Sequence, residues 1–523
     1  MCFRFVSLCV FSLSLFSGFS LSALAAGTEW RVINDWSPAY EKKFSEFVRV
    51  MGESNCKSLD ACLKSPAANP FYVARTPKNR NFGADCAYFP YALRMYFSWM
   101  EGLPFDYVSK VAQANPAEET SPDIRYTKFG NKPAGRRSIA KGQVTDGVAE
   151  LALMRKSIST ATFRMHYREV SDFFPPAVTR ELIRPGAAVY DPSGHAAIIF
   201  KIEKDGRVRM MDAHPDNSVT RITFDQKFIR SRPTHGGGIK HWRPEGNLVQ
   251  TDNLPGFSTE QYNTKFKLGG DAVSFYDFIR GQMAGGSLKF TPVAEIKQMM
   301  LETCSNLRDR EAAVNAAIAS NVQEKRHPDR LPMNIYGTNG EWEEYSTPSR
   351  DARLKVAFVE LRQEIERFLT MYRARNARID YQPVASKYSS RCAADNSSCF
   401  LVASLMSSYE EAVFSPSCIF SYKNSAGQDK KLSYSDIAAR LFKLSFDPYH
   451  CVELRWGASG DELASCRDDD NKLAWYRNEQ GLRNQTERTY ETRMDFDLNG
   501  TARLGVASSP DIDLWGYLGK QLQ

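Results

Sequence analysis

Three residues far apart in the chain have the types that a thiol-dependent hydrolase needs. They are a cysteine before an apolar stretch, a histidine in a strand-like run, and an aspartate after the next turn: Cys86, His195 and Asp212. A thiol becomes a nucleophile when a base takes its proton, and a carboxylate can hold an imidazole base in the right tautomer. Each residue alone is more often structural, but the three in this order predict a nucleophile, a base and an orienting residue.

Cys86 precedes a predicted helix. The apolar residues after it recur with helical spacing, at Phe89, Leu93, Tyr96 and Met100. Asp85 suits the N-cap position, and the positive end of the helix dipole is expected to lower the pKa of Cys86 and favour the thiolate. From this helix alone, a buried or disulfide-bonded cysteine fits equally well.

His195 lies on a predicted antiparallel sheet. The sequence predicts three strands, at residues 187–190, 195–202 and 208–213. Asp205-Gly206 marks a tight turn between the last two. Because side chains alternate along a strand, Asp212 and His214 fall on the same face as His195 in either register of this turn. Asp212 is therefore expected to orient the imidazole, with His214 as the alternative third member.

The number of cysteines supports a free thiol at Cys86. The chain has 11 cysteines, and nine remain once Cys2 and Cys9 are removed with a predicted leader. In an oxidising compartment an odd number leaves one thiol over. Proximity and elimination suggest four disulfides, Cys56–Cys62, Cys392–Cys399, Cys451–Cys466 and Cys304–Cys418. Cys86 is then the unpaired cysteine.

Residues 1–25 have the features of a secretory signal peptide. Arg4 forms the positive region, an apolar stretch follows, and Ala23-Leu24-Ala25 is a small-residue cleavage site. No later segment approaches the roughly 18 apolar residues that a spanning helix needs. We therefore expect an exported protein, periplasmic or secreted, with no stable membrane span in its mature form.

The composition limits the classes of molecule that the protein is expected to bind. The formal charge of +7 becomes +6 without Arg4 (68 − 1 basic against 61 acidic residues). No basic run is dense enough to predict nucleic-acid binding, and this mild charge allows only weak attraction to an anionic surface. The cysteines lack CxxC spacing and no His-Glu-x-x-His motif occurs, so no metal or other cofactor is predicted.

Around these residues the sequence resembles the papain-like superfamily, especially the NlpC-type and CHAP-type bacterial cell-wall hydrolases. The resemblance covers roughly residues 80–245 and rests on three segments: Asp85-Cys86 opening a helix, Pro185–Asp191 before Gly194–Ile199, and Asp205–His214. The sequence departs from the pattern after the cysteine, where Ala87–Pro90 replaces small residues, and in the long stretch before the histidine.

This resemblance implies an α+β fold whose nucleophile helix packs on a small antiparallel sheet. It also implies amide hydrolysis through a thioester, with peptidoglycan stem peptides as the substrate class. By position, Cys86 would be the nucleophile, His195 the base and Asp212 the orienting residue.

The rest of the chain carries no comparable signature. We expect an N-terminal arm with a small disulfide loop over residues 26–80, the papain-like domain over 81–250, and a mostly helical domain over 251–523. Asp495–Gly500 matches the first half of a calcium loop, but Val506 stands where the bidentate glutamate belongs, so a hairpin turn is favoured.

Two other functions stay open at this point. In acyl transfer of the transglutaminase type, an amine would replace water in resolving the thioester. In an exported binding or scaffold protein, the helical region would be the interaction surface and Cys86 would be dispensable.

Overall fold

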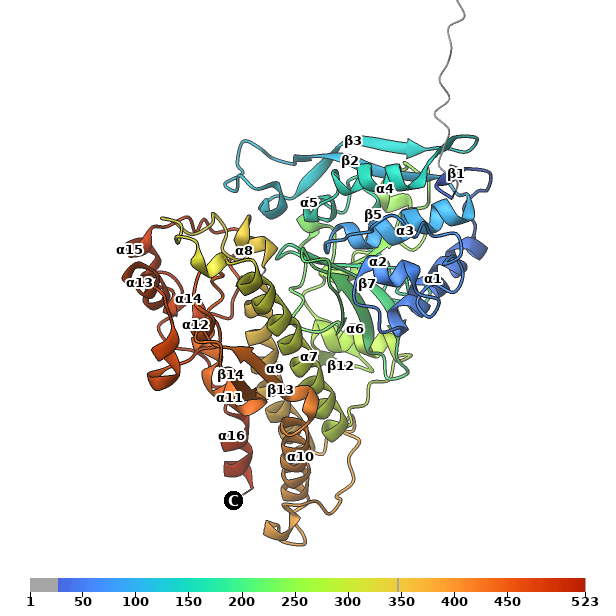
Figure 1. The fold of residues 1–523 in the computed structure, drawn as a ribbon. Coiled ribbons are helices and arrows are strands. Elements are labelled where there is room, and N and C mark those ends of the chain that lie inside the picture. The colour runs from blue at the N-terminus through green and yellow to red at the C-terminus, as the bar shows by residue number, and fades with distance from the viewer. Residues whose placement is uncertain (1–26, 346–347, 523) are drawn as a thin grey trace, which may run out of the picture.

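The computed structural model describes residues 27–345 and 348–522, which form two halves (Figure 1). The first (blue to green) mixes helices with small antiparallel sheets, and the second (yellow to red) is mostly helical. The long helix α7, Pro292–Ala319, lies between them. A mixed helix and sheet architecture was predicted, and the predicted leader lies outside the described residues.

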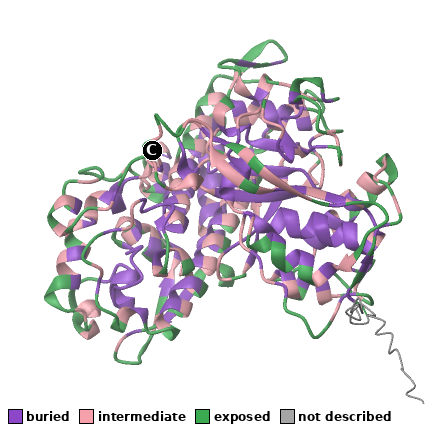
Figure 2. Cartoon of the chain, turned by 90° about the horizontal axis from the view of Figure 1, so that it is seen from above, coloured by how far each residue is buried: buried purple, intermediate pink, exposed green. Residues whose placement is uncertain are grey.

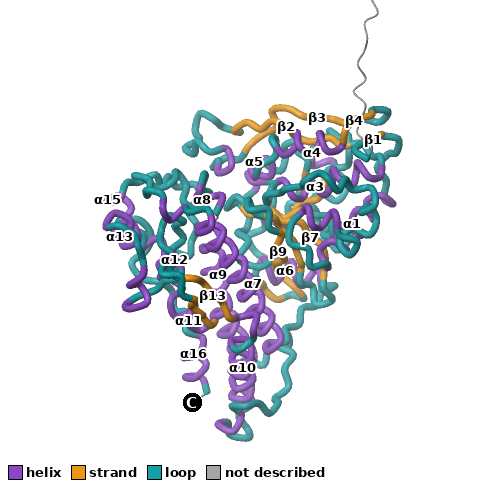
Figure 3. The backbone as a smooth tube through the Cα atoms, in the orientation of Figure 1, coloured by secondary structure: helices purple, strands orange, loops and turns teal. Residues whose placement is uncertain are grey.

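A six-stranded antiparallel sheet forms the centre of the first half (Figure 3). In sheet order its strands are β5 (Phe173–Phe174), β10 (Ile239–Trp242), β6 (Ala188–Asp191), β7 (His195–Ile202), β8 (Val208–Ala213) and β9 (Val219–Thr223). The three predicted strands are therefore confirmed as β6, β7 and β8. Gly206 in the turn between β7 and β8 has φ +83°, a conformation that glycine adopts without strain.

Both faces of this sheet are covered by helices, so its central strands are apolar on both sides. On one face, Ala196 and Ile198 of β7 belong to the core that contains helix α3, Tyr88–Glu101. On the other, Ala197 and Ile199 pack in the core that contains α6, Phe275–Met283. Buried residues run through the centre of both halves (purple in Figure 2).

Helix α3 is buried along almost its whole length. The side chain of Asp85 begins it by accepting hydrogen bonds from the backbone N–H groups of Ala87, at 3.0 Å, and Tyr88, at 2.9 Å. Gly102, with φ +63°, ends it in the left-handed conformation typical of helix C-termini. The predicted helix and its aspartate cap are thus present.

The segment before α3 packs into the same core, where Trp30, Phe44 and Phe47 are fully buried. Its elements, with those between α3 and the sheet, are β1 (Glu29–Arg31), α1 (Pro38–Glu53), α2 (Leu59–Lys64), β2 (Phe105–Gln113), β3 (Asn131–Ile139), β4 (Val144–Asp146), α4 (Gly147–Arg155) and α5 (Thr160–Phe163). Strand β1 pairs with β4, and β2 with β3.

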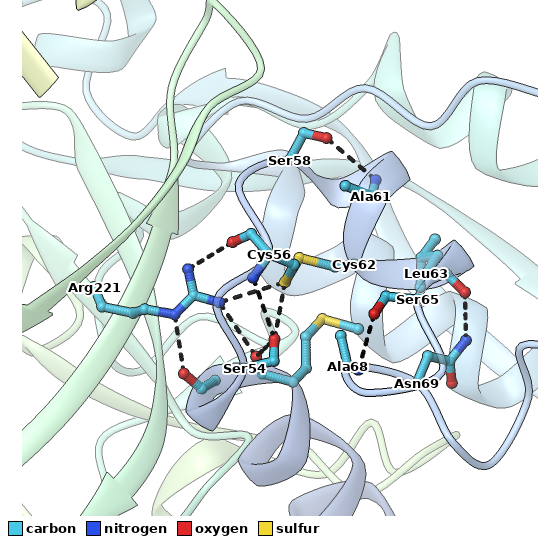
Figure 4. Close-up of a disulfide and its surroundings, with 12 residues drawn as sticks. Ser54, Cys56, Ser58, Ala61, Cys62, Leu63, Ser65, Ala68, Asn69 and Arg221 are labelled. Carbon is cyan, nitrogen blue, oxygen red and sulfur yellow. Dashed lines mark hydrogen bonds between the residues drawn. A yellow bond between two sulfur atoms is a disulfide. The ribbon is translucent and has the colours of Figure 1, made fainter.

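The small disulfide loop Cys56–Cys62 is fastened to strand β9 (Figure 4). Arg221 of β9 donates hydrogen bonds to the carbonyl oxygens of Gly52, at 2.9 Å, and Cys56, at 2.7 Å. The backbone N–H of Val219 also donates to the carbonyl of Lys57, at 2.8 Å. The loop therefore supports the edge strand of the sheet.

The second half is built on three long helices, α7, α9 (Pro348–Arg373) and α10 (Ser397–Val413). Smaller elements complete it: β11 (Phe266–Leu268), β12 (Asp271–Val273), α8 (Glu341–Glu344), β13 (Ile419–Lys423), β14 (Asp429–Ser433), α11 (Tyr434–Arg440), α12 (Val452–Arg455), α13 (Asp470–Asn478), α14 (Gln480–Asn484), α15 (Leu498–Thr501) and α16 (Leu514–Gln521). Of these, β11 and β12 precede α6 in the chain.

The hairpin predicted at Asp495–Gly500 is wrong. This segment enters the short helix α15, and the side chain of Asp497 accepts a hydrogen bond from the backbone N–H of Gly500 at 2.8 Å. An aspartate at an N-cap satisfies a free N–H group of the first helical turn, which here outweighs the turn preference of Asn-Gly.

All four predicted disulfides are present: Cys56–Cys62, Cys304–Cys418, Cys392–Cys399 and Cys451–Cys466. Disulfides of this number are typical of exported proteins. Within the described residues, every helix is too short or too polar to cross a membrane.

Candidate active site

Cys86 lies in the turn that leads into α3 and is the one cysteine of the described residues outside a disulfide. Its side chain is half-buried, and Sγ lies 3.9 Å from the carbonyl oxygen of Gly194. Gly194 is the residue before His195, so the start of α3 meets the start of β7. Cys86 and His195 line the same cavity, but within the described residues no hydrogen bond joins Sγ of Cys86 to the imidazole of His195, which is bonded to Asp212.

His195 forms a short hydrogen bond with Asp212, with 2.6 Å between Nε2 and Oδ2. Ile198 pairs with Met211, and continuing that register places His195 opposite position 214 and diagonal to Asp212. His214 lies further away, with 3.6 Å between its Nε2 and the same carboxylate oxygen. Both candidates for the third member thus reach the site, and Asp212 is the one that binds the imidazole.

Strand β9 supplies a further contact to this carboxylate. The hydroxyl of Thr220 donates to Oδ1 of Asp212 and lies 3.2 Å from Nε2 of His214. Thr220 was not predicted as a site residue, because a threonine in an edge strand has no distinctive sequence signal. Its position depends on β9, which the Cys56–Cys62 loop supports.

The hydrogen bond to Asp212 decides which nitrogen of His195 can act as a base. An ionised carboxylate only accepts hydrogen bonds, so Nε2 of His195 must carry a proton. Burial alone would raise the pKa of Asp212, but His214, His195 and Thr220 outweigh it and hold the pKa well below its usual range. Nδ1 of a neutral His195 is then free to accept a proton.

The surroundings of Cys86 disfavour its thiolate. Burial of the sulfur, together with the negative charge of Asp85, raises the pKa of Cys86 to about 12. The expectation that the helix dipole lowers this pKa is therefore wrong. Desolvation outweighs the dipole, and the residue that caps the helix places a negative charge next to the thiol.

Both histidines of the site are neutral near pH 7. Burial and the positive charge of Arg353 lower the pKa of His195 below its usual value. Burial lowers the pKa of His214 to about 3. The resting site is thus a neutral thiol with a neutral imidazole, rather than a thiolate–imidazolium pair.

A cavity of about 520 Å³ gives access to this site, and both halves of the molecule form its walls. The first half contributes Asp85, Cys86, His195 and His214. The second contributes residues from the α8 region and from the first two turns of α9, among them Glu343, Arg350 and Arg353. The sequence predicted only a mostly helical domain in this region and did not single out these arginines, because no local motif distinguishes them from other polar-face residues.

The two halves are joined at this cavity by specific contacts. Arg125 donates to Glu343, at 2.8 Å, and to the carbonyl oxygen of Thr338, at 3.0 Å. The Tyr126 ring also packs so closely on Gly337 of the second half that an added Cβ there would overlap with the ring. The cavity wall opposite Cys86 is therefore part of a packed interface.

Two groups of side chains in the described residues have the spacing of metal ligands, and both lie away from this cavity. One contains Cys451 and Cys466, which are joined in a disulfide and cannot act as thiolates. The other contains His327, Asp447 and Glu479; in it, Nε2 of His327 lies 2.8 Å from Asp447, a hydrogen-bonding distance.

The structure thus joins His195 to Asp212, places Cys86 and His195 in one cavity, and adds Thr220 and Arg353 to the predicted residues. Comparison of the chain with protein-family models, with curated proteins and with solved structures finds no match in any of the three.

Proposed function

We propose that this protein is an exported cysteine-dependent hydrolase that cleaves an amide bond through a thioester. The observation that carries the proposal is the placement of Cys86, the one free thiol among the described residues, in one cavity with His195, whose imidazole is held by Asp212. A nucleophile, a base and an orienting carboxylate are the parts that this chemistry requires.

In the proposed reaction, Sγ of Cys86 attacks the amide carbonyl carbon while its proton passes to Nδ1 of His195. Asp212 stabilises the imidazolium that forms. His195 then protonates the leaving amine, the C–N bond breaks and a thioester remains. Water attacks the thioester with His195 as base, which releases the acid and returns the proton to the thiol.

The neutral resting state favours general-base catalysis in this scheme. Since the pKa of Cys86 is raised and that of His195 is lowered, the proton moves as the sulfur attacks rather than beforehand.

Peptidoglycan stem peptides are the proposed substrates. This rests on the resemblance of residues 80–245 to cell-wall hydrolases and on the disulfides, which suit an exported protein. The cavity, of about 520 Å³, is large enough to hold the part of a peptide next to the cleaved bond.

The test is incubation of purified wild-type protein and Cys86→Ala with peptidoglycan, measuring newly released amino groups. We expect release by the wild type and a loss of about 10⁴-fold or more in the variant, the size seen when a nucleophile is removed. Equal activity of the two proteins would overturn the proposal.

A second arm adds a primary amine to the same reaction. Incorporation of that amine into the product, in place of a new carboxylate, would show acyl transfer through the same thioester. Absence of any reaction, with the cellular phenotype unchanged by Cys86→Ala, would favour a binding or scaffold protein.

A further inference from the structure

A second cavity, of about 190 Å³, lies between the sheet of the first half and helices α6, α7 and α9. Its lining comes from the ends of β8 and β9, including Phe224 and Asp225, and from the three helices. None of its lining residues belongs to the cavity that contains Cys86. It is therefore a separate space, enclosed by both halves.

The lining of this second cavity is strongly acidic. It contains six carboxylate side chains against three arginines: Asp225, Asp277, Glu295, Glu302, Glu360 and Glu364, with Arg207, Arg280 and Arg367. Five of the six carboxylates have a basic partner within the described residues, the ion pairs being Lys227–Asp225, Arg367–Asp277, Arg280–Glu295, Arg209–Glu302 and Arg367–Glu364.

Glu360 of α9 is the exception. Its side chain is 4% exposed, and Oε1 is buried without a hydrogen-bond partner in the described part of the chain. A buried carboxylate without a partner costs several kcal/mol as an ion, so natural proteins pair such groups or leave them protonated. Lys227 and Arg488 act electrostatically on this carboxyl, but they are paired with Asp225 and Asp191. Glu360 therefore lines the cavity without a direct ion pair in the described part of the chain.

Aromatic rings form another part of the wall. Phe224 and Tyr276 lie side by side, with ring centroids 5.7 Å apart. The face of Phe290 is already used by Arg367, whose guanidinium carbon is 4.5 Å from the ring centroid. Aromatic faces attract cations, most strongly where water is excluded. A carboxylate with neighbouring rings is the combination that recognises an organic cation.

We propose that this second cavity binds an alkylammonium ion, whose positive charge pairs with Glu360 and whose carbon chain packs on Phe224 and Tyr276. The volume sets the size of the ligand, because a cavity of about 150 Å³ holds benzene. A chain of four or five carbons with one ammonium group fits this space. Either a free amine or the side chain of a lysine-type residue has that chemistry.

Ionisation of Glu360 is coupled to this binding. Burial and the nearby Asp225 and Glu364 raise the pKa of Glu360 well above its usual value, and the positive charges of Lys227 and Arg488 offset this only in part, so the carboxyl is protonated in the empty cavity. An entering ammonium ion favours the carboxylate, and the proton leaves to solvent.

The test is isothermal titration of the full-length mature protein with n-pentylamine, which is an ammonium ion at neutral pH, and with n-pentanol as the neutral control. We expect pentylammonium to bind at millimolar concentration or below, at least tenfold more tightly than pentanol, with release of a proton. Glu360→Gln should lose this preference, while Glu344→Gln, an exposed acid at the other cavity, should keep it. Nα-acetyl-lysine amide distinguishes the source: tighter binding than pentylammonium indicates a lysine side chain, and weaker binding a free amine.

Equal affinity of the wild type for pentylammonium and pentanol, or no binding of either, would overturn the proposal without the need for a folded variant. The same preference in Glu360→Gln as in the wild type would also overturn it. The outcome is independent of the proposed hydrolase activity, because the two cavities share no residues.

Discussion

The two halves of the molecule each contain a buried histidine bound to an aspartate, and the histidine of the first half lines the cavity that contains Cys86. In the first half, His195 and Asp212 are 2.6 Å apart next to Cys86. In the second, His327 and Asp447 are 2.8 Å apart, and both side chains are fully buried. The residue types are alike, so they do not by themselves identify a catalytic site.

The second pair has the features of a structural network. His450 lies 2.7 Å from the hydroxyl of Ser445, which resembles a nucleophile and base, yet Ser445 is itself completely buried. The ring of His327 stacks on Trp475 with centroids 4.3 Å apart. A histidine–carboxylate pair can therefore serve stability alone. It points to catalysis only where it lies at a cavity and next to a nucleophile that a substrate can reach.

The largest expected effect separates these two pairs. We predict that His195→Gln lowers amide hydrolysis by about 10⁴-fold or more, because the variant has no base for the thiol. His327→Gln should leave activity per folded molecule unchanged but lower the free energy of unfolding by about 1–3 kcal/mol, the cost of disturbing a buried hydrogen bond. Hydrolysis rates and urea unfolding curves of both variants test this prediction. Loss of activity in folded His327→Gln would contradict a purely structural role for the second pair.

Asp212→Asn should have the next largest effect, about 10³- to 10⁴-fold on the rate, since an amide can hold the imidazole in the wrong tautomer. His214→Gln should cost much less, because His214 does not bind the imidazole of His195. Circular dichroism should show that both variants keep the wild-type fold. A silent Asp212 change with an inactive His214 variant would reverse the assignment of the third member.

Arg353→Gln should change the pH dependence of the reaction. Burial and the charge of Arg353 both lower the pKa of His195, so removing the charge raises it. The base works only when neutral, and the acidic limb of kcat/KM should therefore move to higher pH. Arg350→Gln, whose guanidinium is held 3.4 Å from Asp216, is the control and should shift it less. An unchanged limb in Arg353→Gln would argue against an electrostatic role of the second half.

Asp85→Asn should have the smallest effect, on the thiol itself. Asparagine keeps an oxygen that can accept from the N–H groups of Ala87 and Tyr88, so helix α3 still has its cap. The negative charge that helps raise the pKa of Cys86 is removed, and alkylation at pH 8 should become several-fold faster. Slower alkylation would mean that Asp85 does not disfavour the thiolate.

The comparison of the halves also shows how much of the fold and of the site could be predicted from the sequence. Strands β6 to β8 and helix α3 follow from local alternation and spacing, and a face shared by His195 and Asp212 follows from side-chain alternation in either turn register. The four disulfides followed from parity and proximity. The arginines of α9 could not be placed at the cavity, because their position depends on how two halves pack over long sequence distances.

The prediction of a lowered pKa for Cys86 was wrong for the same reason, because it also depends on packing over long sequence distances. A helix dipole can be inferred from local sequence, whereas the depth of burial of Sγ depends on the whole fold. Likewise, Ser445 and His450 resemble catalytic residues until their complete burial is known.

The most direct test of a free, base-assisted thiol at Cys86 is iodoacetamide labelling of the folded protein without reductant, followed by peptide mapping and an activity assay on the same samples. We predict a single label, on Cys86, with activity lost in proportion to labelling. Because the pKa of Cys86 is raised to about 12, labelling should be slow near pH 7 and should accelerate steadily as the pH rises above the 8.5 or so of an ordinary thiol. A label on another cysteine, with Cys86 found in a disulfide, or full labelling of Cys86 with activity intact, would contradict the account.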